Sequence, residues 1–224
     1  MFKNELILLE LENKNQYLEL QEDDKHIIND IMKSMSIFKV NSYDAQVIKR
    51  DLIGMAQELN LRNSNLKDSI GDDLKGFTDE IIKNSDGPNI IEIVLGFLIK
   101  LSGYFFIWYL LSALLGLSFE SNHIVIPFYI GVVIIAFIVE NLITPLFSTE
   151  TGFKKNLQSL ISLIMIIIWT IIIYLLKGSQ HNVEVNGLAV IIVSGLVYLI
   201  TRYLNSLNIR KLALGKHNFI EDLK

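Results

Sequence analysis

The sequence predicts an all-α protein in which a small helical domain precedes a four-helix transmembrane bundle. The chain has 224 residues and is 51% hydrophobic. Its mean hydropathy of +0.40 is too high for an ordinary soluble protein. Charge is also unevenly divided. Residues 1–89 hold 11 Lys and Arg against 17 Asp and Glu, whereas residues 90–224 hold 9 against 7. Short helical apolar patterns fill the first part, and long apolar runs fill the second.

The same composition excludes several classes of protein. The apolar content excludes a disordered chain and a purely cytosolic one. The chain contains no Cys, which excludes a disulfide-stapled secreted module. Nucleic acid is not an expected partner, because phosphate contacts need clustered Lys and Arg and the polar part is acidic.

Residues 1–86 are expected to form a cytoplasmic domain of short amphipathic helices. The first clear apolar pattern recurs at helical spacing and comprises Ile27, Ile28, Ile31, Met32 and Met35. Asp23 and Asp24 precede it and are expected to cap its start. Ser42 is expected to cap the start of a second helix. Asn60 follows its last apolar residue and suits a left-handed cap.

Two shorter helices complete the predicted domain. One begins at Leu66 and stops at Gly71, and the next is capped by Asp72 or Asp73. The apolar positions of the last helix share one face and are Leu74, Phe77 and Ile81. Gly87 and Pro88 break the helical pattern, so residues 87–92 are assigned to a linker.

Four apolar stretches follow, at residues 93–118, 124–147, 157–176 and 187–204. Each has about the 20 residues that a helix needs to cross ~30 Å of hydrocarbon. Burial of all four in a soluble core is the competing interpretation, but too little polar chain remains to cover them. Residues 205–224 are assigned to a basic tail. Small residues in the stretches serve either a homo-oligomer or packing within one chain, and the sequence leaves this open.

Both termini are expected on the cytoplasmic side of the cell membrane. The loop between the second and third stretches carries Lys154 and Lys155. The loop at 119–123 has no Lys or Arg, and the loop after the third stretch has only Lys177. The end of the chain is rich in cations, which are Arg202, Arg210, Lys211, Lys216 and Lys224. The positive-inside rule then places the termini and the middle loop in the cytoplasm.

Two charges, Lys100 and Glu140, fall inside predicted membrane helices. Both lie about seven residues from the same membrane face, roughly 10 Å deep. Three interpretations stay open: each side chain reaches the headgroups separately, the two form a structural ion pair, or they serve an ion or proton path. Asn141, Thr144 and Pro145 are expected to loosen the helix beside Glu140.

Residues 43–82 carry a family resemblance. The pattern includes Ile70-Gly71-Asp72-Asp73, then Phe77, then Asp79-Glu80-Ile81. It resembles the HAAS-type signalling domain and related small helical domains of Firmicute membrane proteins. That resemblance implies association with PadR-like transcription regulators and carries over no catalytic residue. Asn60 stands where the family pattern has Gly.

These observations favour a non-catalytic protein whose cytoplasmic domain binds a protein partner in signalling or regulation. The partner is expected to be a transcription regulator or a transporter subunit. The expected binding surface comprises Asp72, Asp73, Phe77, Asp79 and Glu80. The acidic residues lack the order of an EF-hand loop, so neither a metal nor a cofactor is expected.

No catalytic motif is present, so an enzyme is not expected. Two alternatives remain. One is a small transporter, or an accessory subunit of an export system, that uses Lys100 and Glu140. The other is a membrane immunity protein. Membrane lipid is the remaining expected contact.

Overall fold

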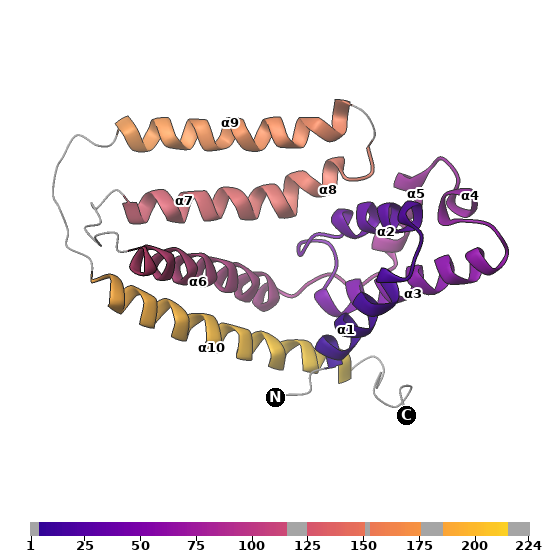
Figure 1. Cartoon of the computed structure of the whole chain (residues 1–224), viewed down its shortest axis with the longest axis horizontal. Helices are drawn as coiled ribbons and strands as arrows, with labels where there is room; N and C mark the ends of the chain where they lie inside the picture. Colours follow the sequence, from indigo (N-terminus) through magenta and orange to yellow (C-terminus); the bar gives the residue numbers. More distant parts are fainter. Residues whose placement is uncertain (1–4, 116–124, 151–152, 176–185, 215–224) are drawn as a thin grey trace. The chain divides into compact units, whose positions relative to one another are not determined.

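The computed structural model describes residues 5–115, 125–150, 153–175 and 186–214, and every regular element in these ranges is a helix (Figure 1). The all-α prediction is therefore confirmed. The chain divides into two compact units. Unit 1 comprises Met1–Ile93, Asn141–Lys155 and Ser206–Lys224, and unit 2 comprises Val94–Glu140 and Asn156–Asn205.

Five helices in the N-terminal part of the chain form the body of unit 1. They are α1 (Glu5–Leu18), α2 (Glu22–Ser34), α3 (Ser42–Leu61), α4 (Leu66–Ile70) and α5 (Leu74–Lys83). The largest buried side chains of their shared core include Ile28, Ile31, Ile53 and Leu66. Leu74, Phe77 and Ile81 of α5 pack against this core, as the spacing of the three residues predicts.

The helix ends in this unit differ in part from the expected caps. Asn41 caps α3, because its side chain accepts the Asp44 N–H at 2.9 Å, and Ser42 is the first helical residue. The N-cap of α2 is Gln21, whose side chain makes no capping hydrogen bond. The cap predictions for Asp23, Asp24 and Ser42 are therefore wrong.

The C-terminal end of α3 also lies beyond its predicted position. The helix continues to Leu61, and the left-handed residue that follows is Asn63, with φ of 56°. Asn60 instead donates a side-chain hydrogen bond to Asp24 Oδ2 at 3.2 Å. The end of α4 at Gly71, where φ is 76°, is as predicted.

The second core of unit 1 joins residues from opposite ends of the sequence. Leu9 of α1 and Tyr43 of α3 cluster with Ile209 and Ala213 of α10 (Gly187–Leu214), and these side chains are at most 3% exposed. Residues 205–214 are therefore helical and partly buried, so the prediction of a tail from residue 205 is wrong for this stretch. The α10 sequence keeps apolar residues four apart here, which holds one face against α1.

Four candidate membrane spans are present in the described residues, at Ile90–Leu114, Pro127–Phe147, Asn156–Leu175 and Gly187–Ala213. They lie in α6 (Ile90–Leu114), in α7 (Val125–Ile138) with the π-helix η1 (Val139–Ile143) and α8 (Thr144–Phe147), in α9 (Phe153–Leu175), and in α10. The lengths and apolar composition are those of a multi-pass membrane protein, as predicted.

One predicted boundary in this region needs correction, and several predicted features lie outside the residues that the structure describes. Residues 90–92, assigned to the linker, form the first turn of α6. The loop at 119–123, Lys177, Lys216 and Lys224 lie outside the described residues.

Within unit 2, α6 and α10 pack through glycines. A Cβ at Gly103 would lie 3.4 Å from the Tyr198 ring, and one at Gly195 would lie 3.2 Å from the Phe106 ring. Each helix thus places an aromatic ring over a glycine of the other. This arrangement shows that small residues predicted to allow close approach serve packing within one chain.

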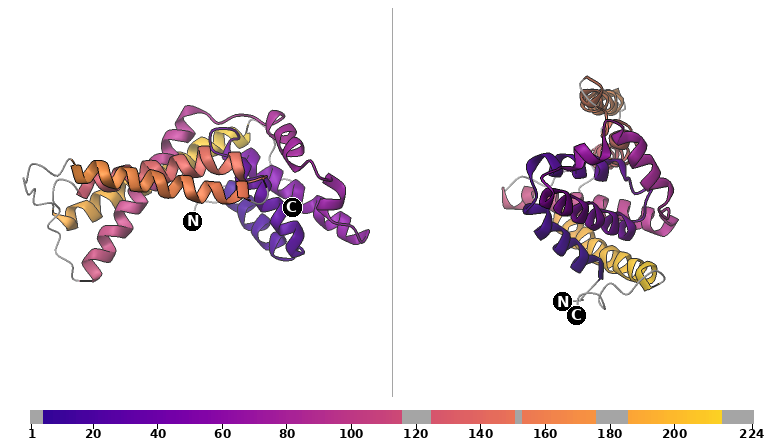
Figure 2. Two further views of the ribbon diagram at one scale, coloured as in Figure 1. Left: turned by 90° about the horizontal axis from the view of Figure 1, so that it is seen from above. Right: turned by 90° about the vertical axis from the view of Figure 1, so that its right-hand side faces the viewer.

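Trp169 of α9 makes a specific contact with α7 inside unit 2. Trp169 donates its indole N–H to the Phe128 carbonyl of α7 at 3.1 Å. Its ring fills the space over Gly131, where a Cβ would lie only 2.0 Å away. The ribbon shows α9 running beside α7 in both views (Figure 1 and Figure 2). No side chain in the α9 span is buried among the described residues, so its apolar surface faces outward.

Candidate functional sites

The first candidate site is the ion pair between Lys100 of α6 and Glu140 of η1. The Lys100 ammonium donates a hydrogen bond to Glu140 Oε2. Of the three arrangements that the sequence leaves open, the structure brings the two charges into contact. The Lys100 side chain is 31% exposed and the Glu140 side chain 59% exposed in the protein alone. The pair therefore lies at the surface of unit 2, where it is accessible.

One aromatic ring lies beside the cationic partner of this pair, and a second ring packs on the first. The Lys100 ammonium lies 5.6 Å from the centre of the Phe137 ring, which is within cation–π range. Phe97 contacts the same ring edge-on, with 5.2 Å between ring centres. These rings keep water from one side of the ammonium and strengthen its attraction to Glu140.

A π-helical turn carries the anionic partner. The turn covers Val139–Ile143, and Pro145 follows it in α8. Proline has no N–H, so Pro145 cannot donate the i to i−4 hydrogen bond of an α-helix to the Asn141 carbonyl. The backbone here forms a wider π-helical turn instead. The helix is thus irregular beside Glu140, where loosening is expected, and Pro145 supplies a physical reason for it. Such turns occur often at functional positions.

The second candidate site is a hydrogen-bonded joint in unit 1, between the start of α3 and the segment that leads into α6. The Asp86 carbonyl accepts hydrogen bonds from the Asn41 N–H and the Asn41 side-chain amide, both at 3.1 Å. The Asp86 N–H donates to Asp44 Oδ2 at 3.1 Å. This part of the chain is non-helical, as predicted, but these bonds fix it against α3.

Glu92 extends the joint into the first turn of α6. Its side chain is 1% exposed, and its Oε1 accepts the Ser42 N–H at 2.6 Å. The Glu92 N–H donates to Asn89 Oδ1 at 2.7 Å, and Asn89 donates its side-chain amide to Asn208 of α10 at 3.2 Å. The starts of α3 and α6 and the end of α10 are thus tied together by side chains.

A further contact brings the end of the second span into unit 1. The hydroxyl groups of Ser34 and Ser148 are 2.7 Å apart and buried. Ser34 ends α2, and Ser148 directly follows α8. Unit 1 therefore contains the ends of three of the four apolar spans, together with the five N-terminal helices.

The residues predicted to bind a partner divide into two groups. Asp72, Asp79 and Glu80 are exposed. Asp73 is exposed but caps α5, because its Oδ1 accepts the Gly76 N–H at 2.8 Å. Phe77 is partly buried against the core of unit 1, which assigns it a packing role. Asp72, Asp79 and Glu80 are therefore the exposed acidic residues of this set that do not cap a helix.

Sequence reasoning missed the role of Glu92. The local pattern Asn89-Ile-Ile-Glu92 has the spacing of a capping box, in which the Glu side chain turns back to its own helix start. The structure keeps the Asn89 half of that motif and directs the carboxylate to α3 instead. The pattern is a usable signal for the start of α6, but it does not indicate that the Glu92 side chain contacts α3.

In the ranges that the structure describes, no group of three or more His, Cys, Asp or Glu side chains is placed to hold a metal ion. Comparison of the chain with protein-family models, curated proteins and solved structures finds no match. The functional argument therefore rests on the geometry of the two sites.

Proposed function

We propose that this protein is a non-catalytic membrane protein whose N-terminal helical domain binds a protein partner in signalling or regulation. One observation carries the proposal: unit 1 combines the N-terminal helices with the ends of three apolar spans. A partner held by this unit is mechanically connected to the membrane helices. The resemblance of residues 43–82 to HAAS-type domains supports the same role, with a transcription regulator or transporter subunit as the partner and the cytoplasm as the side it occupies.

The proposed binding surface is the acidic face made by Asp72, Asp79 and Glu80. All three are exposed, and none makes a capping bond within the described residues. Their negative charge favours a partner with a basic surface and speeds its association. Asp73 caps the start of α5 and Phe77 packs on the core, so both stabilise the helix that carries Asp79 and Glu80.

The test is capture from native membranes by the full-length tagged chain after mild crosslinking in cells. We expect the double variant Asp79→Lys and Glu80→Lys to lose its partner, because the approaching basic surface then meets like charge. The matched control is Glu19→Lys with Asp23→Lys, which changes the charge equally at two exposed positions elsewhere on unit 1. Mass spectrometry of the captured proteins gives the readout.

Equal recovery by both double variants would show that the acidic face is not the binding surface. Recovery of the tagged chain alone, from unmodified protein, would contradict the partner-binding role itself. Surface variants are preferred to deletion of residues 1–86, because deletion would remove the side chains that cover Ile209 and Ala213.

The ion pair supports a second candidate, a small transporter or export subunit. An accessible carboxylate on a π-helical turn, paired with a lysine, has the chemistry of a proton or ion relay. For such a relay, Glu140→Gln is expected to abolish proton uptake into proteoliposomes loaded with a pH-sensitive dye. Glu80→Gln is the control. If Glu140→Gln and unmodified protein give equal traces above an empty-liposome baseline, the pair is not a relay.

A further inference from the structure

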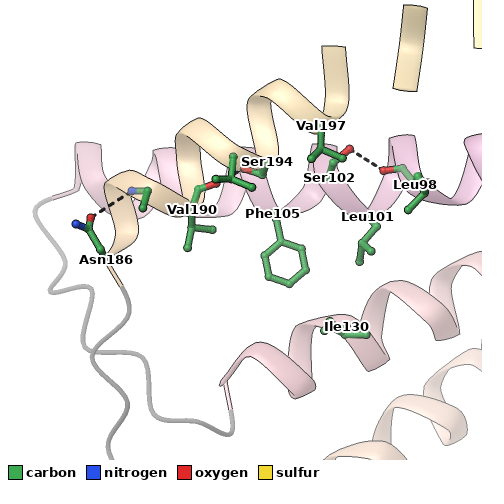
Figure 3. Close-up of a pocket in the computed structure, with 11 residues that line it drawn as sticks. Leu98, Leu101, Ser102, Phe105, Ile130, Asn186, Val190, Ser194 and Val197 are labelled. Atoms are coloured by element: carbon green, nitrogen blue, oxygen red, sulfur yellow. Dashed lines mark hydrogen bonds between the residues drawn. The ribbon is translucent and has the colours of Figure 1, made fainter. Parts of the chain in front are cut away.

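An elongated groove runs along α10 within unit 2, between α10, α6 and one residue of α7. Its volume is about 570 Å³. Its apolar walls include Leu98, Leu101, Phe105, Ile130, Val190 and Val197. The close-up shows Leu101 and Phe105 projecting from α6 toward Ile130 of α7, with the α10 side chains along the other wall (Figure 3). Val193 of α10 also lines the groove and is 59% exposed, so the groove opens at the protein surface.

The space exists because the α10 wall is made of small side chains. Ala189, Val190, Ser194 and Val197 follow one another along the groove, where leucines would have filled it. The contacts of Gly103 with Tyr198 and of Gly195 with Phe106 also join α6 and α10, and a second hollow of about 400 Å³ is lined by these residues.

The polar atoms in the groove are already used by their own helices. The Ser102 hydroxyl donates to the Leu98 carbonyl, and the Ser194 hydroxyl donates to the Val190 carbonyl, each at 2.6 Å (Figure 3). The two hydroxyls therefore offer no donor to an occupant of the central part of the groove and keep only weakly exposed acceptor positions. The rest of the lining here is apolar, so an apolar occupant fits this part of the groove best, because a buried polar group without a partner is costly.

One end of the groove differs from the rest. Asn186 accepts the N–H groups of Leu188 and Ala189 through its Oδ1, at 3.1 and 3.2 Å, and so caps α10. Its amide nitrogen is left as a donor at this end. The groove thus combines a long apolar channel with one polar terminus, which suits a chain-like molecule that carries an oxygen acceptor at one end.

The length of the groove narrows the class of occupant. Its lining on α10 extends from Asn186 to Val197, which is about 16 Å along a helix. One leaflet of a bilayer has a hydrocarbon depth of roughly 15 Å, half of the ~30 Å core. We propose that this groove is a binding site for one acyl chain of a membrane phospholipid, with the ester region at Asn186. The inference is independent of the proposed partner-binding role.

The test uses full-length protein in nanodiscs of phosphatidylcholine, of which a small fraction carries a diazirine on one acyl chain. After irradiation, peptide mass spectrometry locates the labelled residues. We expect label to concentrate on the α6 and α10 walls of the groove, at Phe105 and Val190. Val193→Trp should remove that label, because the indole occupies the channel.

The matched control is Ile192→Trp, at a neighbouring position on α10. Ile192 is 52% exposed, close to the value for Val193, but it does not line the groove. Val197→Trp is a second groove-filling variant, to be used if Val193→Trp loses its helical circular dichroism. The proposal would be overturned if the label were spread evenly over the exposed face of α9 and the groove, and if neither Val193→Trp nor Val197→Trp changed it. Crosslinks that place a second copy of the chain in the groove would overturn it too.

Discussion

Two neighbouring aspartates show how much a single residue's role depends on distant chain. Asp23 is exposed, whereas Asp24 is fully buried. Asp24 Oδ1 accepts the Leu66 N–H at 2.8 Å, and its Oδ2 accepts from the Asn60 amide at 3.2 Å. Local pattern gives both residues the same expected role at the start of α2. The difference arises only when α4 packs against α2, and no local signal contains that contact.

This difference gives a prediction for Asp24→Ala. Removal of the carboxylate leaves the buried Leu66 N–H without its acceptor, and we expect the free energy of local opening around α4 to fall by about 3 kcal/mol. Hydrogen exchange of the amides in residues 60–70, measured by mass spectrometry on the full-length protein, is the readout. Asp23→Ala is the control and should cost less than about 1 kcal/mol. Equal exchange in the two variants would refute the assigned role of Asp24.

At the scale of elements, helix positions follow from the sequence better than helix ends. The apolar runs place all four spans, because 20 apolar residues in succession have few other stable states. The end of α10 was placed ten residues too early, since Arg202 and Asn205 end the continuous apolar run. The helix continues beyond them as an amphipathic one, with Ile209 and Ala213 buried. Counting consecutive apolar residues finds the membrane-spanning part of α10, but it does not detect that the helix continues as an amphipathic one.

The contact between α7 and α9 gives a prediction at this scale. In Gly131→Ala the new methyl group overlaps the Trp169 ring, so the indole must leave its place and lose its bond to Phe128. We expect a loss of about 1–3 kcal/mol in the packing of α9. With Trp108 replaced by Phe, fluorescence quenching by brominated lipid chains reports how far Trp169 turns toward the lipid, and quenching should increase.

Gly54→Ala in α3 serves as the control for that experiment. A Cβ at Gly54 meets nothing within 4 Å, so the change should add about 1 kcal/mol of helix propensity and leave the quenching unchanged. If Gly131→Ala gives the same quenching as the parent protein, the assigned packing of Trp169 over Gly131 is wrong.

At the scale of the whole molecule, the class of protein was predictable and the composition of the units was not. Segregated charge and four apolar runs are sufficient to predict an all-α membrane protein. The sequence also marks Lys100 and Glu140 as unusual, although only the folded chain brings them into contact. The inclusion of residues 141–155 and 206–224 in unit 1 depends on contacts between segments far apart in the chain, such as Ser34 with Ser148. The spacing of apolar residues along the sequence does not predict contacts between such distant segments.

The cluster that joins Leu6 and Leu9 to Ile209 and Ala213 has a consequence for biosynthesis. The helix α1 can pack on α3 as soon as both have been made, but the part of Leu6 and Leu9 that contacts Ile209 and Ala213 stays uncovered until α10 is made. Exposed apolar surface on such an intermediate is what chaperones and proteases recognise. Translation that stops before α10 is made therefore yields a product in which part of the Leu6 and Leu9 surface is exposed.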